Sequence, residues 1–366
     1  MDDRVREHAR IIVEHSIDLQ AGDEVLLSGG ELAEDLLIAL HEEIGKRGAF
    51  PVVWSRPSRA HRAFMHAMDP ENYDDVPDTL AAMVEHVDAT VGIRAAKNTH
   101  EQGDIPPEKN TAMATLFQPI QSQMMEKRWV GTQYPAPGNA QDAEMSTEAY
   151  EEFVWNAINK DWEEQREFQQ PMADRLDEGS EVHIVSGDTT DIVMSIEGTV
   201  GKNDHAENNL PGGEVFTAPV PDSVEGEVLF DMPLMAHGRE VQDVHLTFED
   251  GEVVDFSAGK NEEVLAAVLD TDDGAKRIGE LGIGMNRDID RFTYNMLFDE
   301  KMGDTVHMAL GRAYEENVPE DCDVERNESA IHMDMIVDMS EDSTITIDGE
   351  LVQQDGTFWF EDGFEE

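Results

Sequence analysis

The last third of the chain contains the heptapeptide Ala330-Ile331-His332-Met333-Asp334-Met335-Ile336. Apolar and polar side chains alternate along it, and this period of two predicts a β-strand. Because residues two apart in a strand share a face, His332 and Asp334 should point to the same side. An imidazole and a carboxylate fixed next to each other on a rigid element are suitable ligands for a metal ion.

The sequence around this heptapeptide also predicts a strand-rich region. Short apolar or alternating runs are separated by glycine or acidic turns, which is typical of consecutive strands. These runs are Val182–Val185, Ile192–Ile196, Val228–Phe230, Val244–Phe248 and Val253–Phe256. We therefore expect a C-terminal catalytic, metal-binding domain of α+β type over residues 176–366.

The first half of the chain has a different pattern, in which helical and strand segments alternate. Residues 5–19 and 32–44 repeat apolar side chains at helical spacing, and a helical pattern also covers 147–176. Strands are expected at 23–27, 49–54, 89–93 and 129–134. Such alternation favours an open, mostly parallel sheet, so we predict an N-terminal α/β domain over residues 1–175. Gly29-Gly30 lacks the full dinucleotide fingerprint and is expected to form a turn.

Histidines and carboxylates in the second half form a potential ligand set. The candidates are Glu214, Glu280, Glu300, His307, His332 and Asp334. The four carboxylates carry four negative charges, which two divalent cations would balance; without cations they would have to repel one another or take up protons. Taken singly, each residue has a structural alternative: a core histidine, a surface turn at Glu214, or a solvated carboxylate at Glu300.

Five ordered blocks surround these candidates. They are Asn209-Leu210-Pro211-Gly212-Gly213-Glu214-Val215-Phe216-Thr217-Ala218-Pro219, Ile278-Gly279-Glu280-Leu281-Gly282-Ile283-Gly284-Met285-Asn286, Asp299-Glu300-Lys301, His307-Met308-Ala309-Leu310-Gly311 with Tyr314, and His332-Met333-Asp334. Through these blocks the chain resembles the thermophilic metallo-aminopeptidase family, of the aminopeptidase T type. The resemblance covers nearly the whole chain.

The resemblance implies a role for each candidate residue. Five of them match the family's metal ligands, namely Glu214, Glu280, His307, His332 and Asp334. Glu300 matches a further carboxylate near the metals, and Tyr314 matches the active-site tyrosine. Tyr314 also has a structural alternative, in which it packs at the end of a helix begun near His307. The chain departs from some members at Gly213, where they carry an acid, and in its longer spacer between Glu300 and His307.

The expected function is therefore that of a metal-dependent aminopeptidase. Two divalent ions, Zn, Co or Mn, would activate water and polarise a peptide carbonyl. Capture of a free α-amine would confine cleavage to the first bond of peptide substrates. Glu214 and Glu280 would each act as ligand or proton carrier, and Tyr314 would stabilise the oxyanion. Alternatives are another dinuclear amide hydrolase and a catalytically silent, metal-stabilised protein, and the resemblance further implies a homodimer.

The charge of the chain is strongly negative. It has 81 acidic residues against 26 Lys and Arg, a formal net charge of −55. Because the acids are spread along the chain, we interpret them as an adaptation to a halophilic cytosol and not as a binding tail. Nucleic acid is excluded as a partner. We expect no signal peptide and no membrane-spanning segment, and the single Cys322 indicates a reducing, cytoplasmic location.

We predict that the fold depends on salt. At molar KCl the Debye length is about 3 Å, so the repulsion among the acids is screened. Dilution to low ionic strength should therefore lower the melting temperature. Circular dichroism melts across a KCl series would measure this, and a constant melting temperature would rule out the halophilic interpretation.

Overall fold

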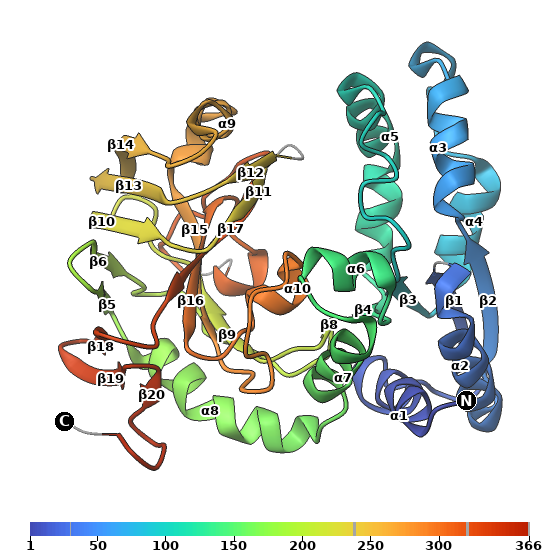
Figure 1. Cartoon of the computed structure of the whole chain (residues 1–366), viewed down its shortest axis with the longest axis horizontal. Coiled ribbons are helices and arrows are strands. Elements are labelled where there is room, and N and C mark those ends of the chain that lie inside the picture. The colour runs from blue at the N-terminus through green and yellow to red at the C-terminus, as the bar shows by residue number, and fades with distance from the viewer. Residues whose placement is uncertain (30, 237–238, 320–321, 365–366) are drawn as a thin grey trace. The chain divides into compact units, whose positions relative to one another are not determined.

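The computed structural model describes residues 1–29, 31–236, 239–319 and 322–364. The chain forms two compact units (Figure 1): unit 1 comprises Met1–Trp162 with Ala206–Gly212, and unit 2 comprises Glu163–His205 with Gly213–Glu366. The domain boundary expected near residue 175 falls within helix α8 (Trp162–Glu178), and it stays a prediction. Of the turn expected at Gly29-Gly30, Gly29 is instead the last residue of strand β1, and Gly30 lies outside the described residues.

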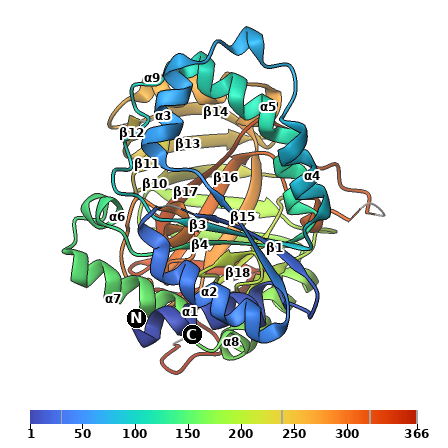
Figure 2. The ribbon, with the colours of Figure 1, turned by 90° about the vertical axis from the view of Figure 1, so that its right-hand side faces the viewer.

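Unit 1 is an open parallel sheet with the strand order β2-β1-β3-β4-β8 (Figure 2). Its strands are β1 (Glu24–Gly29), β2 (Phe50–Ser55), β3 (Ala89–Arg94), β4 (Arg128–Gln133) and β8 (Asn209–Leu210). Its helices are α1 (Asp3–Ile11), α2 (Glu34–Arg47), α3 (Ser58–Ala67), α4 (Asp78–His86), α5 (Pro107–Met125), α6 (Pro137–Asp142) and α7 (Thr147–Ile158). The expected parallel α/β arrangement is confirmed.

Strand β1 shows why the sequence gives this sheet. Val25, Leu26 and Leu27 are consecutive and fully buried, as expected for a central parallel strand that is covered on both faces. Leu26 packs with side chains of α4 and α5 in one apolar cluster. On the helical side, Asp2 caps α1 by accepting a hydrogen bond from the backbone N–H of Arg4.

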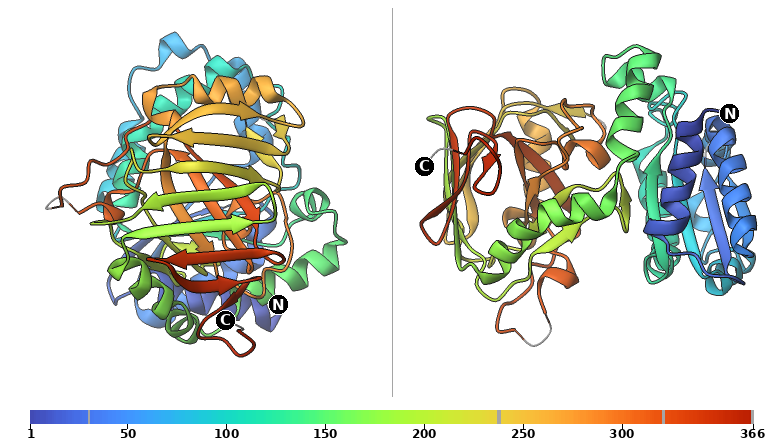
Figure 3. Two further views of the ribbon diagram at one scale, coloured as in Figure 1. Left: turned by 90° about the vertical axis from the view of Figure 1, so that its left-hand side faces the viewer. Right: turned by 90° about the horizontal axis from the view of Figure 1, so that it is seen from below.

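Unit 2 contains two antiparallel sheets that pack together (Figure 3). The larger sheet has the order β14 (Glu252–Ser257), β13 (Val244–Glu249), β10 (Glu225–Phe230), β6 (Thr190–Ser195), β5 (Glu181–Ser186), β18 (Ser343–Ile347), β19 (Glu350–Gln354) and β20 (Thr357–Phe358). The smaller has the order β17 (His332–Asp338), β16 (Thr305–Gly311), β15 (Ile278–Gly284), β9 (Glu214–Thr217) and β7 (Lys202–Asp204). Helices α9 (Glu262–Leu269) and α10 (Met296–Asp299) and the hairpin β11 (Leu234–Ala236)–β12 (Arg239–Val241) complete the unit with α8.

The core of unit 2 lies between these sheets. The smaller sheet contributes every second residue, such as Leu281, Met308 and Met335, and the larger sheet contributes Ile184 and Leu246 among others. The remaining residues of β15, β16 and β17 point away from this core. The strand-rich α+β prediction for this part of the chain is thus confirmed, and one face of the smaller sheet is left for other side chains.

The structure corrects the helix proposed as an alternative near His307. That segment is strand β16, and all seven of its residues are buried. A central strand that is covered on both faces shows no exposed polar side, so its periodicity cannot distinguish it from a buried helix. Within the described ranges, no helix combines the length and the apolar character needed to traverse a lipid bilayer.

Candidate metal centre

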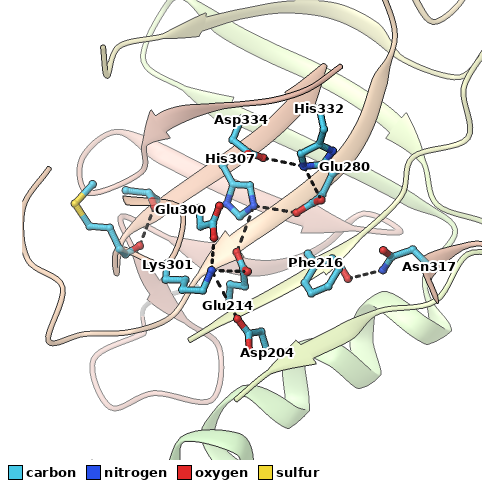
Figure 4. A network of polar contacts seen from close by, with 12 residues as sticks. Asp204, Glu214, Phe216, Glu280, Glu300, Lys301, His307, Asn317, His332 and Asp334 are labelled. Carbon is cyan, nitrogen blue, oxygen red and sulfur yellow. Dashed lines mark hydrogen bonds and ion pairs between the residues drawn. The ribbon is translucent and has the colours of Figure 1, made fainter. Parts of the chain in front are cut away.

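The face of the smaller sheet that points away from the core carries all five ligands implied by the resemblance. Strand register pairs Glu280 of β15 with Ala309 of β16, and Ala309 with Asp334 of β17. The two carboxylates therefore lie on the two strands that flank Ala309. His307 is paired with Gly282, and Glu214 with Gly284. Figure 4 shows the side chains converging above these strands. Residues up to 120 positions apart in sequence are therefore brought together by antiparallel pairing.

His307 is buried between two carboxylates. Its Nε2 lies 3.2 Å from Oε1 of Glu280 and 3.4 Å from Oε2 of Glu214. Burial disfavours the imidazolium, but these carboxylates outweigh burial and raise the pKa of His307 to about 9. The three residues form one cluster whose potential ligand atoms lie within 4.8 Å of one another.

His332 belongs to a second cluster, with Glu280 and Asp334. Its Nδ1–H donates to the backbone carbonyl of Arg312 at 2.8 Å, and this bond orients the ring. Nε2 then lies 3.4 Å from Oε2 of Glu280 and 3.4 Å from Oδ1 of Asp334. Burial lowers the pKa of His332, but Asp334 and Glu280 outweigh it and raise that pKa to about 10.

Glycine makes room for the His307 ring. A Cβ atom placed on Gly282 would lie 2.0 Å from Cε1 and 2.1 Å from Nε2 of His307, so a larger residue would displace the imidazole. The small side chain of Ala309 similarly leaves space between the side chains of Glu280 and Asp334. The small residues of the sequence blocks thus create the hollow in which the ligand atoms meet.

Lys301 is, with Asp204, a site residue that the sequence did not predict. Its side chain is fully buried, and its Nζ lies 2.9 Å from Oε1 of Glu214 and 3.6 Å from Oδ2 of Asp204. Nζ also donates to Oε1 of Glu300, which connects Glu300 to Glu214 through one ammonium group. The carboxylates outweigh burial and hold the pKa of Lys301 well above its ordinary value. Its only sequence signal is its place in the Asp299-Glu300-Lys301 block.

The turn that carries Glu300 and Lys301 is fixed by Asp299. This buried carboxylate accepts hydrogen bonds from the backbone N–H and hydroxyl of Thr293 and from the backbone N–H of Asn295. Burial nevertheless raises the pKa of Asp299 to about 7. Asp299 therefore acts on the loop geometry and does not join the cluster of ligand atoms.

The donor set suits cations. Five carboxylates, of Asp204, Glu214, Glu280, Glu300 and Asp334, meet the single ammonium of Lys301, which leaves a formal charge of −4 before the histidines are counted. Burial also raises the pKa of Glu214 to about 8, although Lys301 opposes that shift. Oε2 of Glu214 and Oε2 of Glu280 are buried without a hydrogen bond, which is costly unless a cation or a proton satisfies them.

Tyr314 lies beside this cluster and follows strand β16. Its ring centroid is 4.7 Å from that of His332 and 6.1 Å from that of Phe216. Burial and the charges of Glu280 and Asp334 raise the pKa of the phenol above its ordinary value. The hydroxyl is therefore protonated throughout the physiological range, and it can donate a hydrogen bond.

A comparison with protein-family models identifies the family of the chain. The model of the thermophilic metalloproteases, M29, matches residues 1–363. The chain belongs to this family. Family membership implies a divalent metal, and the buried carboxylates and imidazoles described above are a donor set that fits one.

Named relatives and a solved structure agree with the M29 assignment. Aminopeptidase T of Thermus thermophilus is 28% identical over 95% of this chain and 94% of its own. Aminopeptidase 2 of Geobacillus stearothermophilus is 27% identical over 96% of this chain and 94% of its own. The structure of wild-type AmpT from Thermus thermophilus matches with a TM-score of 0.86 at 25% identity, covering 98% of this chain and 99% of that chain. Together they support a metallo-aminopeptidase, a hydrolase.

We predict that Gly282→Ala weakens metal binding by at least about tenfold, because the added methyl displaces the imidazole of His307. Gly131→Ala is the matched control, since a Cβ on that strand glycine meets no atom within 4 Å. Metal titrations and thermal melts of both variants measure the effect. Unchanged affinity in Gly282→Ala would mean that His307 is not a ligand.

Metal binding should also release protons. With pKa values raised to about 9 and 10, His307 and His332 are protonated at pH 7 in the metal-free protein, whereas a coordinating nitrogen must be free. Affinity should therefore rise with pH and level off above about pH 10. Calorimetry in buffers of different ionisation enthalpy would count the released protons. The His332→Gln variant should release one proton fewer than the wild type. Release near zero in the wild type would contradict the assignment of both histidines as ligands.

Proposed function

We propose that this metallo-aminopeptidase would hold two divalent cations, with Glu280 as a ligand common to both sites. The observation that supports this proposal is that the two oxygens of Glu280 face different histidines, Oε1 toward His307 and Oε2 toward His332. Each histidine has one further carboxylate, Glu214 for His307 and Asp334 for His332. Two ligand clusters that share one carboxylate are the arrangement expected of a dinuclear centre.

The cations themselves would be Zn²⁺, Co²⁺ or Mn²⁺, because mixed imidazole and carboxylate ligation suits all three. When bound, they supply water of lowered pKa and polarise a carbonyl group. Together with Lys301, two of them neutralise the five carboxylates. Glu300, which Lys301 holds beside Glu214, is the weakest candidate ligand, because it belongs to neither cluster.

Proton transfer is assigned to Glu214. Its Oε2 is buried without a hydrogen bond, so it is available to accept a proton from water and to return it. Lys301 positions this group through its contact at 2.9 Å. Tyr314 would donate its O–H to the oxyanion that develops on the substrate carbonyl.

The substrates would be peptides with a free N-terminus. The free α-amine of the peptide would bind at the cluster, either to one cation or to a nearby carboxylate, and this would hold the first peptide bond at the site. The homodimer, the cytoplasmic location and the adaptation to salt stay predictions that rest on the sequence.

Peptide hydrolysis should require both the metal and the free amine. Chelation should abolish turnover, added Zn²⁺, Co²⁺ or Mn²⁺ should restore it, and an N-acetylated copy of the same peptide should not be cleaved. The assay is run in molar KCl, with a melt to confirm that the chelated protein stays folded. Equal cleavage of the blocked peptide would favour another dinuclear amide hydrolase, and a folded, metal-loaded protein without turnover would favour a structural metal site.

Tyr314→Phe should lower kcat by about 10²–10³ while metal content and the melting temperature stay normal, because only the hydroxyl is removed. Phe216→Leu, a change at the ring that packs against Tyr314, serves as the packing control. The measurement is kcat, KM and bound metal for each variant. If turnover falls only in proportion to lost metal, then Tyr314 has a structural role.

A further inference from the structure

Unit 1 contains a cleft at the carboxyl ends of its parallel strands, formed entirely by residues of that unit. Its volume is about 580 Å³, within the size range of small-molecule sites. Strand register aligns Trp54, Ser28, Gly92 and Gly131 in one row across β2, β1, β3 and β4, and all four line the cleft. The cleft therefore opens on one face of the sheet.

Two residues earlier along β1 and β2, the same face of the sheet is covered by helices. Leu26 of β1 and Val52 of β2 pack against the apolar side chains of α4 and α5. Ser28 follows Leu26 on this face, and the helical cover is replaced there by the start of α3, which contributes Ser58 and His61 to the cleft. The hollow thus begins where the apolar packing ends.

The glycines of the cleft floor are not required by packing within the chain. A Cβ on Gly131 would meet no atom within 4 Å, and one on Gly92 would meet only ordinary contacts at 3.8 and 4.0 Å. Neither residue has the positive φ that favours glycine. Because glycine weakens a strand, its presence at two neighbouring positions indicates that another molecule approaches the backbone closely.

Two arginines extend from the same face into the cleft. The Arg56 guanidinium lies 5.0 Å from the Trp54 ring centroid and 6.0 Å from that of Phe117, and one of its N–H groups faces Nε2 of His61 at 3.4 Å. Arg94 is two residues beyond Gly92 on β3. Neither arginine forms an ion pair with any residue in the described part of the chain.

That lack of acidic partners is unusual for this protein, in which acids outnumber Lys and Arg by 81 to 26. Six other arginines of unit 1 do pair with carboxylates: Arg4, Arg6, Arg10, Arg47, Arg62 and Arg128. Two unpaired guanidinium groups in one cleft therefore form a local positive site, and guanidinium is the group that best matches the oxygens of carboxylate and phosphate.

We propose that this cleft binds a small molecule through a phosphate or carboxylate group held by Arg56 and Arg94. The strand order supports the location, because β2 and β3 lie on opposite sides of β1, and the crevice at such a reversal is where open α/β sheets bind ligands. Ser28 and Ser58 add hydroxyl groups, and Gly92 and Gly131 leave space for the body of the ligand. This site is separate from the metal ligands, which all belong to unit 2.

The test is calorimetric titration of the metal-loaded, full-length protein with inorganic phosphate, AMP and succinate in molar KCl, where diffuse attraction is screened. At least one probe should bind. Arg56→Gln and Arg94→Gln should each weaken it by about tenfold or more, since each removes a charged hydrogen-bond donor. Arg59→Gln is the matched control, because Arg59 is an exposed arginine of α3 that does not line the cleft.

A second variant separates loss of the site from loss of the fold. Gly131→Val fills the cleft where a side chain has room, so it should abolish binding without lowering the melting temperature. Tighter binding of AMP than of phosphate would identify a phosphorylated organic ligand, and binding of succinate alone would identify a carboxylate. The proposal is overturned if no probe binds at millimolar concentration, or if Arg59→Gln weakens binding as much as the cleft variants do.

Discussion

Buried negative charge is the constraint on which the catalytic unit depends. Carboxylates of Glu214, Glu280 and Asp334 meet on one face of a sheet whose other face is an apolar core. The protein interior does not solvate these carboxylates, so they need positive charge nearby. This need explains why the pKa values of His307 and His332 are raised. Protons satisfy it in the metal-free protein, and we propose that divalent ions satisfy it in the enzyme.

The sandwich supplies the rigidity that such a site needs. Leu281, Met308 and Met335 alternate with the ligand positions of β15, β16 and β17, and they are clamped between the two sheets. Each candidate ligand therefore belongs to a strand that cannot move without disturbing the core. Glycine and alanine on the ligand face provide space, and Lys301 fixes Glu214 from the side away from the histidines. Stability and ligand geometry thus arise from the same alternation.

Local patterns in the sequence predicted much of this structure. The parallel sheet of unit 1 follows from the alternation of helical and strand segments. The pairing of His332 with Asp334 follows from a period of two, and both residues do lie on one face of β17. These features depend on neighbours in sequence, so one chain is enough to find them.

Features that depend on long-range register could not be predicted. Strand β16 is uniformly buried, so its pattern also allowed a helix. Lys301 was not predicted as a site residue, because only the folded chain brings Glu214 and Asp204 to its ammonium group. Likewise, the position of Glu280 between His307 and His332 depends on the register of three strands. The number of negative charges could be counted from the sequence. Their distribution between the two clusters could not be predicted from it.

The most direct test of the account is the number of metal ions bound per chain in the wild type, Glu280→Gln and Glu300→Gln, measured by elemental analysis after equilibration with limiting free Zn²⁺. Glu280 belongs to both clusters and Glu300 to neither. We predict two ions in the wild type, loss of both in Glu280→Gln, and near-normal content in Glu300→Gln. A Glu280→Gln variant that still holds two ions, or a wild type that holds only one, would contradict the bridged dinuclear centre.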